Sequence, residues 1–107
     1  METRLGKIEN ITVGLNDSRF GVHVTLSGPG WGVQDSKGAW GLGTKCTSNC
    51  TWTEEDRSAE FDKAFRWLNK LLIDTKKETI EQLQGVPVAA TFEGNLLKSW
   101  RILTEVL

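Results

Sequence analysis

Two tryptophans in a glycine-rich stretch are the residues of this chain best suited to hold a ligand. Trp31 and Trp40 lie in the sequence GPGWGVQDSKGAWGLG, and Trp52 follows a short distance beyond. An indole is a large flat surface for stacking on a base or another ring, and it is enriched among the residues that dominate protein interfaces. The alternative is that both indoles fill the end of the core. The glycines that leave the backbone beside them accessible are Gly28, Gly30, Gly32, Gly38, Gly41 and Gly43.

Cations near these indoles would suit an anionic ligand, because Arg and Lys donate charge-assisted hydrogen bonds to phosphate and carboxylate oxygens. The cations that we expect near the two indoles or their sheet are Arg19, Lys37, Lys45 and Arg101. The sequence therefore predicts a ligand-binding site made of Trp31, Trp40, Gly30, Gly32, Lys37, His23 and Arg19.

The sequence supports a catalytic site or a metal site less well than a ligand-binding site. His23 is the only histidine. With Cys46 or Cys50 and Asp35 it could form a nucleophilic triad, and with both cysteines and a carboxylate it could form a zinc site. No local motif supports either arrangement, and the three-residue gap between the cysteines is looser than that of a zinc knuckle. We expect two reduced loop cysteines, a polar His23 on the outer face of its strand, and no catalytic residue, metal or cofactor.

Two further patterns have structural explanations. The acidic run Glu54-Glu55-Asp56 suits the start of a helix, where carboxylates interact favourably with the helix dipole. Gly28-x-Gly30-x-Gly32 follows a strand but does not lead into a helix. It therefore lacks the amide cradle of a dinucleotide-binding fingerprint.

Composition places the chain among small globular domains. It has 107 residues, of which 38% are hydrophobic and 25% charged, and its net charge is −1. A near-neutral charge disfavours tight binding to nucleic-acid backbones, which requires clustered positive charge. The first ten residues lack the apolar core of a signal peptide, and no apolar run approaches a membrane span. We expect one domain over residues 1–107, located in the cytoplasm.

The element that the rest of the chain is expected to pack on is a helix over residues 53–74, with apolar residues at three- and four-residue spacings. Thr51 or Thr53 is expected to cap it. Alternating patterns predict a hairpin from residues 7–15 and 20–27, with Phe20, Val22, Val24 and Leu26 facing the core. Ile11, Val13 and Leu15 are expected to share one face of the first strand.

The remaining segments complete an α+β domain. A second hairpin is expected to turn at residues 35–38 and to bring Trp31 and Trp40 close together. A short helix that begins after Thr79 and strands at residues 86–92 and 97–107 follow, the last of them central in the sheet or, alternatively, helical. Trp67 and Trp100 are expected in the core. The predicted fold is two-layered, with an antiparallel sheet of about six strands in the order β-β-β-β-α-α-β-β, covered by one long helix.

The chain resembles a group of small uncharacterised proteins of bacteriophages and prophages. The resemblance rests on TFEGNLLKSWRILTEVL, on KIENITVGL, and on GWGVQDSKGAWG followed by WTEEDR, and it covers most of the chain. Where that group has a glycine-rich loop between the first two strands, this chain has Asn16-Asp17-Ser18-Arg19. The resemblance implies a phage origin and the host cytoplasm, and it supplies no catalytic residues.

By analogy with phage accessory proteins, we expect a non-enzymatic anti-defence protein that sequesters a nucleotide-type small-molecule signal, as a homo-oligomer that builds the pocket between subunits. The alternatives are an inhibitor that blocks a host defence protein and, less favoured, an enzyme acting on nucleotides. A part in phage DNA metabolism or structure is a further alternative, which the near-neutral charge disfavours.

Overall fold

The computed structural model describes residues 1–16, 19–41 and 52–107, with residues 39–41 described by their backbone alone. Its elements are β1 (Glu2–Asn16), β2 (Arg19–Gly28), β3 (Trp31–Gly41), α1 (Glu54–Thr75), η1 (Ile80–Leu83), β4 (Pro87–Glu93), β5 (Leu96–Ile102) and η2 (Thr104–Val106). The strands form one antiparallel sheet in the order β3-β2-β1-β4-β5. The predicted α+β fold is confirmed, with five strands in the sheet instead of about six.

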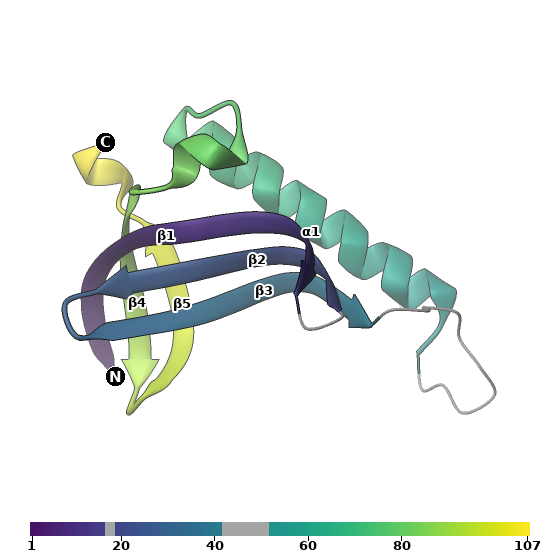
Figure 1. The fold of residues 1–107 in the computed structure, drawn as a ribbon, viewed down its shortest axis with the longest axis horizontal. Helices are drawn as coiled ribbons and strands as arrows, with labels where there is room; N and C mark the ends of the chain where they lie inside the picture. The colour runs from purple at the N-terminus through teal and green to yellow at the C-terminus, as the bar shows by residue number, and fades with distance from the viewer. Residues whose placement is uncertain (17–18, 42–51) are drawn as a thin grey trace.

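The long strand β1 bends the sheet. Its residues 2–7 pair with β4 and its residues 7–16 pair with β2, and the register shifts between Ile8 and Asn10. Such a bulge bends a strand and increases its twist. As a result β4 and β5 cross the direction of β2, β3 and the second half of β1 at a steep angle (Figure 1). The curled sheet brings its two outer strands, β3 and β5, toward each other.

Helix α1 begins and ends through local hydrogen bonds. The Thr53 hydroxyl accepts from the amide of Asp56 at 3.1 Å, and the Asp56 carboxylate accepts from the amide of Thr53 at 2.8 Å. This capping box selects Thr53 rather than Thr51 as the N-cap. Lys76 ends the helix with a left-handed φ of 58°.

No helix among the described residues is long and apolar enough to cross a bilayer.

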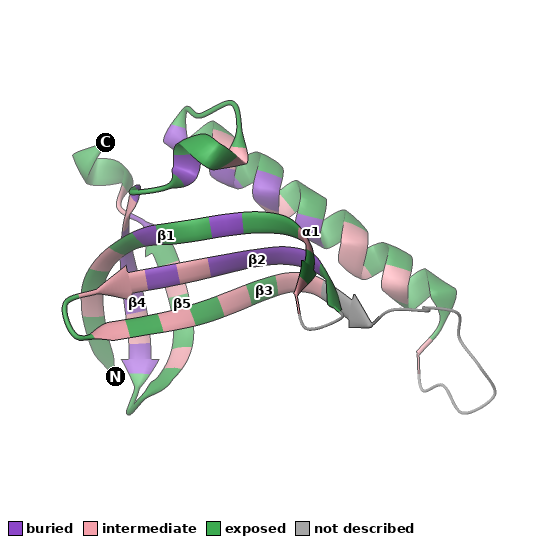
Figure 2. Cartoon of the chain, viewed as in Figure 1, coloured by how far each residue is buried: buried purple, intermediate pink, exposed green. Residues whose placement is uncertain are grey.

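The core lies between α1 and the inner face of the curled sheet. α1 packs mainly on β3 and β2, and Val22, Val24 and Leu26 are buried as predicted (Figure 2). The prediction is wrong for Phe20, which is 41% exposed. Val13 and Leu15 were expected on the same face as Ile11 and do follow it by alternation, yet they are 39% and 60% exposed. Since α1 lies over β3 and β2, it does not cover this end of β1.

The predicted second hairpin is wrong, because residues 31–41 form one continuous strand. Gly38 does have the left-handed φ of 68° that a turn would use. It uses that φ in a bulge, where the β2–β3 register shifts between Phe20 and Val22. A Cβ at Gly38 would lie 3.1 Å from the Cβ of Ala64, so glycine also allows the close approach of α1.

The C-terminal strand is shorter and differently placed than predicted. β5 stops at Ile102 and is an outer strand of the sheet, and residues 104–106 form the single turn of η2. Trp100 and Ile102 lie two residues apart on the same face of β5, and both pack against the core. Thr79 precedes η1 as expected, but its side chain makes no capping hydrogen bond.

Candidate ligand-binding site

The two tryptophans of the predicted site occupy opposite ends of β3. Trp31 pairs with Gly28 next to the β2–β3 turn, and the backbone of Trp40 pairs with Phe20 at the other end. Nine residue-to-residue steps of extended strand separate their Cα atoms by about 30 Å, at roughly 3.3 Å per step. The Trp40 side chain lies outside the described residues. The expectation that Trp31 and Trp40 lie close together is therefore wrong.

The Trp31 side chain packs against residues of the neighbouring strands. Its ring packs edge-on against Phe92, with 5.4 Å between ring centres. Cβ atoms added at Gly6 or Gly28 would come within 2.6 and 2.4 Å of the Trp31 ring. Gly6 on β1 and Gly28 on β2 thus leave the space that this indole occupies. This placement agrees with the alternative that Trp31 packs in the fold instead of binding a ligand.

The other predicted site residues around these indoles are scattered. His23 is only 4% exposed, and its Nε2 lies 3.1 Å from the carbonyl oxygens of both Gly14 and Arg19. Carbonyl oxygens only accept, so Nε2 carries the proton, while Nδ1 lies 2.8 Å from the Ser36 hydroxyl. His23 therefore ties β1, β2 and β3 together. Gly30 has the positive φ of the β2–β3 turn, and Gly32 and Arg19 are exposed on the strands.

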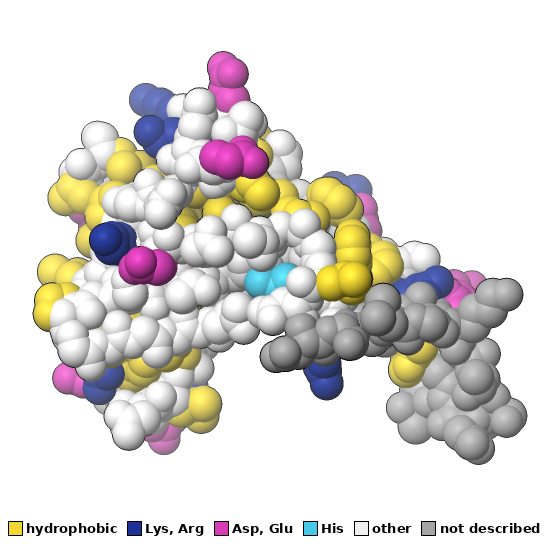
Figure 3. All heavy atoms as spheres, in the orientation of Figure 1, with side chains coloured by type: hydrophobic (Ala, Val, Ile, Leu, Met, Phe, Trp, Pro, Cys, Tyr) yellow, Lys and Arg dark blue, Asp and Glu magenta, His cyan; other side chains and the backbone are white. Residues whose placement is uncertain are grey.

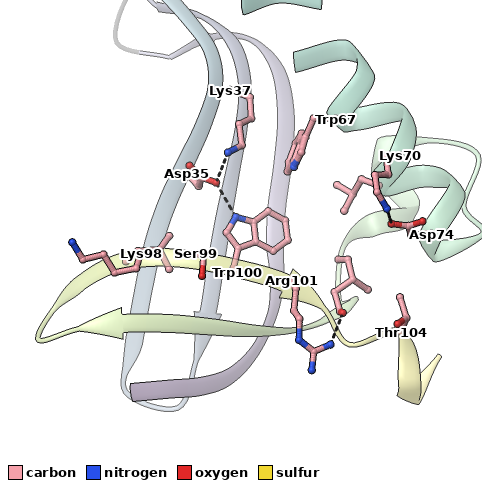
Figure 4. A pocket seen from close by; sticks show the side chains of 13 residues that line it. Asp35, Lys37, Trp67, Lys70, Asp74, Lys98, Ser99, Trp100, Arg101 and Thr104 are labelled. Carbon is pink, nitrogen blue, oxygen red and sulfur yellow. Dashed lines mark hydrogen bonds and ion pairs between the residues drawn. The ribbon is translucent and has the colours of Figure 1, made fainter. Parts of the chain in front are cut away.

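Two predicted residues, Gly30 and Trp31, line a shallow groove of about 630 Å³ beside the β2–β3 turn. Another, Lys37, lines a second groove that is better enclosed. This groove has a volume of about 600 Å³ and opens between β3, α1 and β5 (Figure 4). Its volume lies within the usual range of small-molecule sites, roughly 300–1,000 Å³. The side chains that define it are those of Asp35, Lys37, Trp67, Lys70, Lys98 and Trp100. We refer to it as the Trp67–Trp100 groove.

The centre of the groove is a chain of four contacts. The Trp100 indole donates from Nε1 to Oδ2 of Asp35 at 2.8 Å, and the Lys37 ammonium lies 3.6 Å from the same carboxylate oxygen. Lys37 also lies 5.6 Å from the ring centre of Trp67, within reach of a cation–π attraction. Trp67 and Trp100 meet edge to face, with 5.8 Å between ring centres. Both indoles are partly exposed, so each leaves ring surface open to the groove.

The charge around the groove is mainly positive. Lys37, Lys70, Lys98 and Arg101 line it, against the carboxylates of Asp35 and Asp74. Lys70 pairs with Asp74 at 2.6 Å, and Lys98 pairs with Glu93 at 3.3 Å. Both ion pairs are exposed, and exposed ion pairs contribute little stability. An incoming anion can therefore replace Asp74 or Glu93 as the partner of the lysine.

Arg101 lies at the rim and points away from the two indoles (Figure 4). Its guanidinium donates two hydrogen bonds of 3.0 Å to the two oxygens of Glu105. These hydrogen bonds are the main reason that the pKa of Glu105 falls from 4.5 to about 2, and they raise the pKa of Arg101. The same fork geometry suits a phosphate group.

Trp67 and Trp100 were expected in the core, and both do pack against it. Their second role, lining a groove together with Lys37, was not predicted. One signal was present: Trp67, Lys70, Leu71 and Asp74 recur at helical spacing, which places a ring and a cation beside the buried face of α1.

Within the described residues, no group of three or more His, Cys, Asp or Glu side chains is arranged to hold a metal ion. Cys46 and Cys50, which the zinc and triad alternatives required, lie outside those residues, as does Lys45. No protein-family model, no curated protein and no solved structure matches this chain.

Proposed function

We propose that this protein is a non-enzymatic binding protein that holds a small nucleotide-type ligand in the Trp67–Trp100 groove. The observation that carries the proposal is the position of the Lys37 ammonium, 5.6 Å from the Trp67 ring and beside the partly exposed Trp100. A flat ring and an adjacent cation match the two chemical parts of a nucleotide, its base and its phosphate.

The geometry suggests how such a ligand would be held. Its base would stack on the open indole surface, since stacking of a base on an aromatic side chain is worth about 1–3 kcal/mol. Its phosphate would approach Lys37, with Lys70 and Lys98 at the margin of the groove. The four lining cations exceed the two lining carboxylates, so the groove attracts an anion although the whole chain has a net charge of −1.

The lining residues support binding rather than catalysis. The described residues around the groove include serine and threonine hydroxyls but no histidine that could activate them. Its two carboxylates already interact with Trp100, Lys37 and Lys70. In the phage setting that the sequence resemblance implies, such a protein would act in the host cytoplasm by sequestering a nucleotide signal of a defence system.

The test is a thermal-shift and tryptophan-fluorescence titration of the purified protein with cyclic nucleotides and ADP-ribose. A ligand at a hundredfold excess over its dissociation constant stabilises the folded state by about 2.7 kcal/mol. Binding beside Trp67 and Trp100 should also change the indole emission. Absence of a shift with every nucleotide contradicts the proposal and favours the alternative of an inhibitor that binds a host protein.

Lys37→Met locates the site, because it removes the ammonium and keeps an unbranched side chain over Trp67. We expect it to weaken binding at least tenfold, which corresponds to about 1.4 kcal/mol. Lys63→Met is the matched control. Lys63 is an exposed lysine of α1 whose ion pair with Glu60, like that of Lys37 with Asp35, is loose, and it does not line the groove. Equal loss of binding in both variants would place the ligand elsewhere.

A further inference from the structure

The second half of β1 has a strand edge without a partner among the described residues. β1 pairs with β4 only through residues 2–7, and Ile8 adds backbone hydrogen bonds to Val86 and Gly85 of 2.9 and 2.8 Å. From Asn10 to Asn16, β1 pairs with β2 on one side, and no described strand pairs with it on the other, although the short helix η1 packs against β1. An edge of this kind is a template for pairing with another chain.

The backbone groups that face outward can be identified from one side-chain contact. The Gly14 carbonyl oxygen lies 3.1 Å from His23 Nε2 of β2, so the hydrogen-bonding groups of Gly14 face β2. Backbone groups alternate in direction along an antiparallel strand. The amide and carbonyl groups of Ile11, Val13 and Leu15 therefore face away from β2, on the same side as those of Ile8.

The open edge also differs from the other two outer strands in charge. The segment Asn10–Asn16 reads NITVGLN and contains neither a charged residue nor proline. In contrast, β3 carries Asp35 and Lys37, and β5 carries Lys98 and Arg101. Charged residues are the usual protection of an edge strand against pairing, so this edge of β1 alone, among those described, lacks that protection.

Exposed apolar side chains accompany the edge. Val13 is 39% and Leu15 60% exposed, and Phe20, which pairs with Leu15, is 41% exposed. Phe20 contacts Phe61 of α1, with 5.9 Å between ring centres, and Phe65 lies one turn further along the helix. Figure 3, drawn in the orientation of Figure 1, shows hydrophobic side chains between β1 and α1, at the top of the sheet in this view. A patch of this kind beside an open edge is typical of an interaction surface.

We propose that the outer edge of Asn10–Asn16 is a dimer interface, and that its occupant is the same segment of a second copy of this chain. An antiparallel two-fold axis at Val13 would place Val13 opposite its copy and Ile11 opposite Leu15. The outward amide and carbonyl groups of all three residues would then pair across the axis. The two sheets would join into one continuous sheet and cover Val13 and Leu15.

The uncharged edge is the reason to favour a second copy over a different partner. An edge with charged side chains repels its own copy when a two-fold axis brings like charges together, and Asn10–Asn16 contains none. A partner selected by electrostatic complementarity would leave the opposite signature, with charged residues at the edge. The interface is also self-complementary in its hydrogen bonds, as a two-fold interface must be.

The test compares charge variants at the proposed axis by sedimentation over a concentration series. Val13→Lys alone and Val13→Glu alone should both weaken dimerisation at least tenfold, because each places like charges opposite each other. A mixture of the two variants should form a dimer again, since Lys then opposes Glu. Gln34→Lys is the control, because Gln34 is exposed on the outer strand β3.

Recovery in the mixture cannot arise from misfolding, since neither variant would regain its fold from the other. A wild-type chain that stays monomeric up to about 1 mM, the concentration that corresponds to a binding energy of about 4 kcal/mol, overturns the proposal. Folded variants that dimerise like wild type, or that stay monomeric when mixed, overturn the axis at Val13. Loss of the dimer in Gln34→Lys alone would move the interface to β3.

Discussion

The indole Nε1 of Trp100 donates a 2.8 Å hydrogen bond to Oδ2 of Asp35, although the two residues lie 65 positions apart. Asp35 belongs to β3, the first strand in the sheet order, and Trp100 belongs to β5, the last. The bond therefore links the two ends of the curled sheet, and it fixes one wall of the Trp67–Trp100 groove. Its loss should affect both the stability of the fold and the shape of the groove.

We predict that Trp100→Phe lowers the free energy of unfolding by about 1–2 kcal/mol, since the variant keeps a ring but removes the donor to a charged acceptor. The measurement is urea denaturation of Trp100→Phe, Asp35→Ala and the double variant. The two single effects should be non-additive by at least about 0.5 kcal/mol, as residues in contact usually are. Additive effects would mean that the hydrogen bond does not contribute to stability.

Gly38 should tolerate substitution poorly for two reasons that act together. Its φ of 68° is strained for any other residue, and a new Cβ would lie 3.1 Å from the Cβ of Ala64. We expect Gly38→Ala to destabilise the fold by about 1–3 kcal/mol. Gly32→Ala, where the nearest atom lies at 3.7 Å and no positive φ is involved, should change stability little. Thermal unfolding of the pair measures the difference, and equal effects would refute the bulge at Gly38.

His23 should prove structural. His23→Ala removes the hydrogen bonds to the carbonyl oxygens of Gly14 and Arg19 and to the Ser36 hydroxyl. Groups left unpaired in a buried position cost about 1–3 kcal/mol, so we expect a loss of stability in that range. Nucleotide affinity, measured by the fluorescence titration under conditions where the variant is folded, should stay within about twofold of wild type, a change of less than 0.5 kcal/mol. Loss of affinity without loss of stability would instead return His23 to the ligand site.

The Arg101–Glu105 pair should give a defined acid dependence of stability. Hydrogen bonds from Arg101 lower the pKa of Glu105 in the folded state from 4.5 to about 2. Between these two values the unfolded state binds more protons, so the contribution of the pair is present above pH 4.5 and is lost as the pH falls toward 2. Urea midpoints of wild type and Glu105→Gln should therefore converge as the pH falls across this range. Parallel curves would show that the pair is not formed in solution.

Glu105→Gln also tests the competition for Arg101. If the ligand phosphate reaches Arg101, removal of the carboxylate should raise nucleotide affinity, because the guanidinium no longer has to leave an ion pair. Unchanged affinity would place the phosphate at Lys37 alone. The titration used for Lys37→Met measures both outcomes.

The sequence by itself determined the elements that local patterns encode. The periodicity of residues 53–74 predicted α1 almost to its ends, and alternation predicted β1 and β2 with Val22, Val24 and Leu26 in the core. These predictions succeeded because a helix of period 3.6 and a strand of period 2 each bury one face, whatever else the chain does. The α+β class followed from the order of those elements.

Only the tertiary structure decided where the indoles lie. Gly38 reads as a turn residue in the sequence, and its positive φ suits a turn and a bulge equally well. In the fold it forms a bulge, so Trp31 and Trp40 lie at opposite ends of β3, while Trp67 and Trp100 meet across the curled sheet. The curl depends on the bulge in β1 and on the packing of α1 over β2 and β3. Both are long-range effects, and no local pattern of residues specifies them.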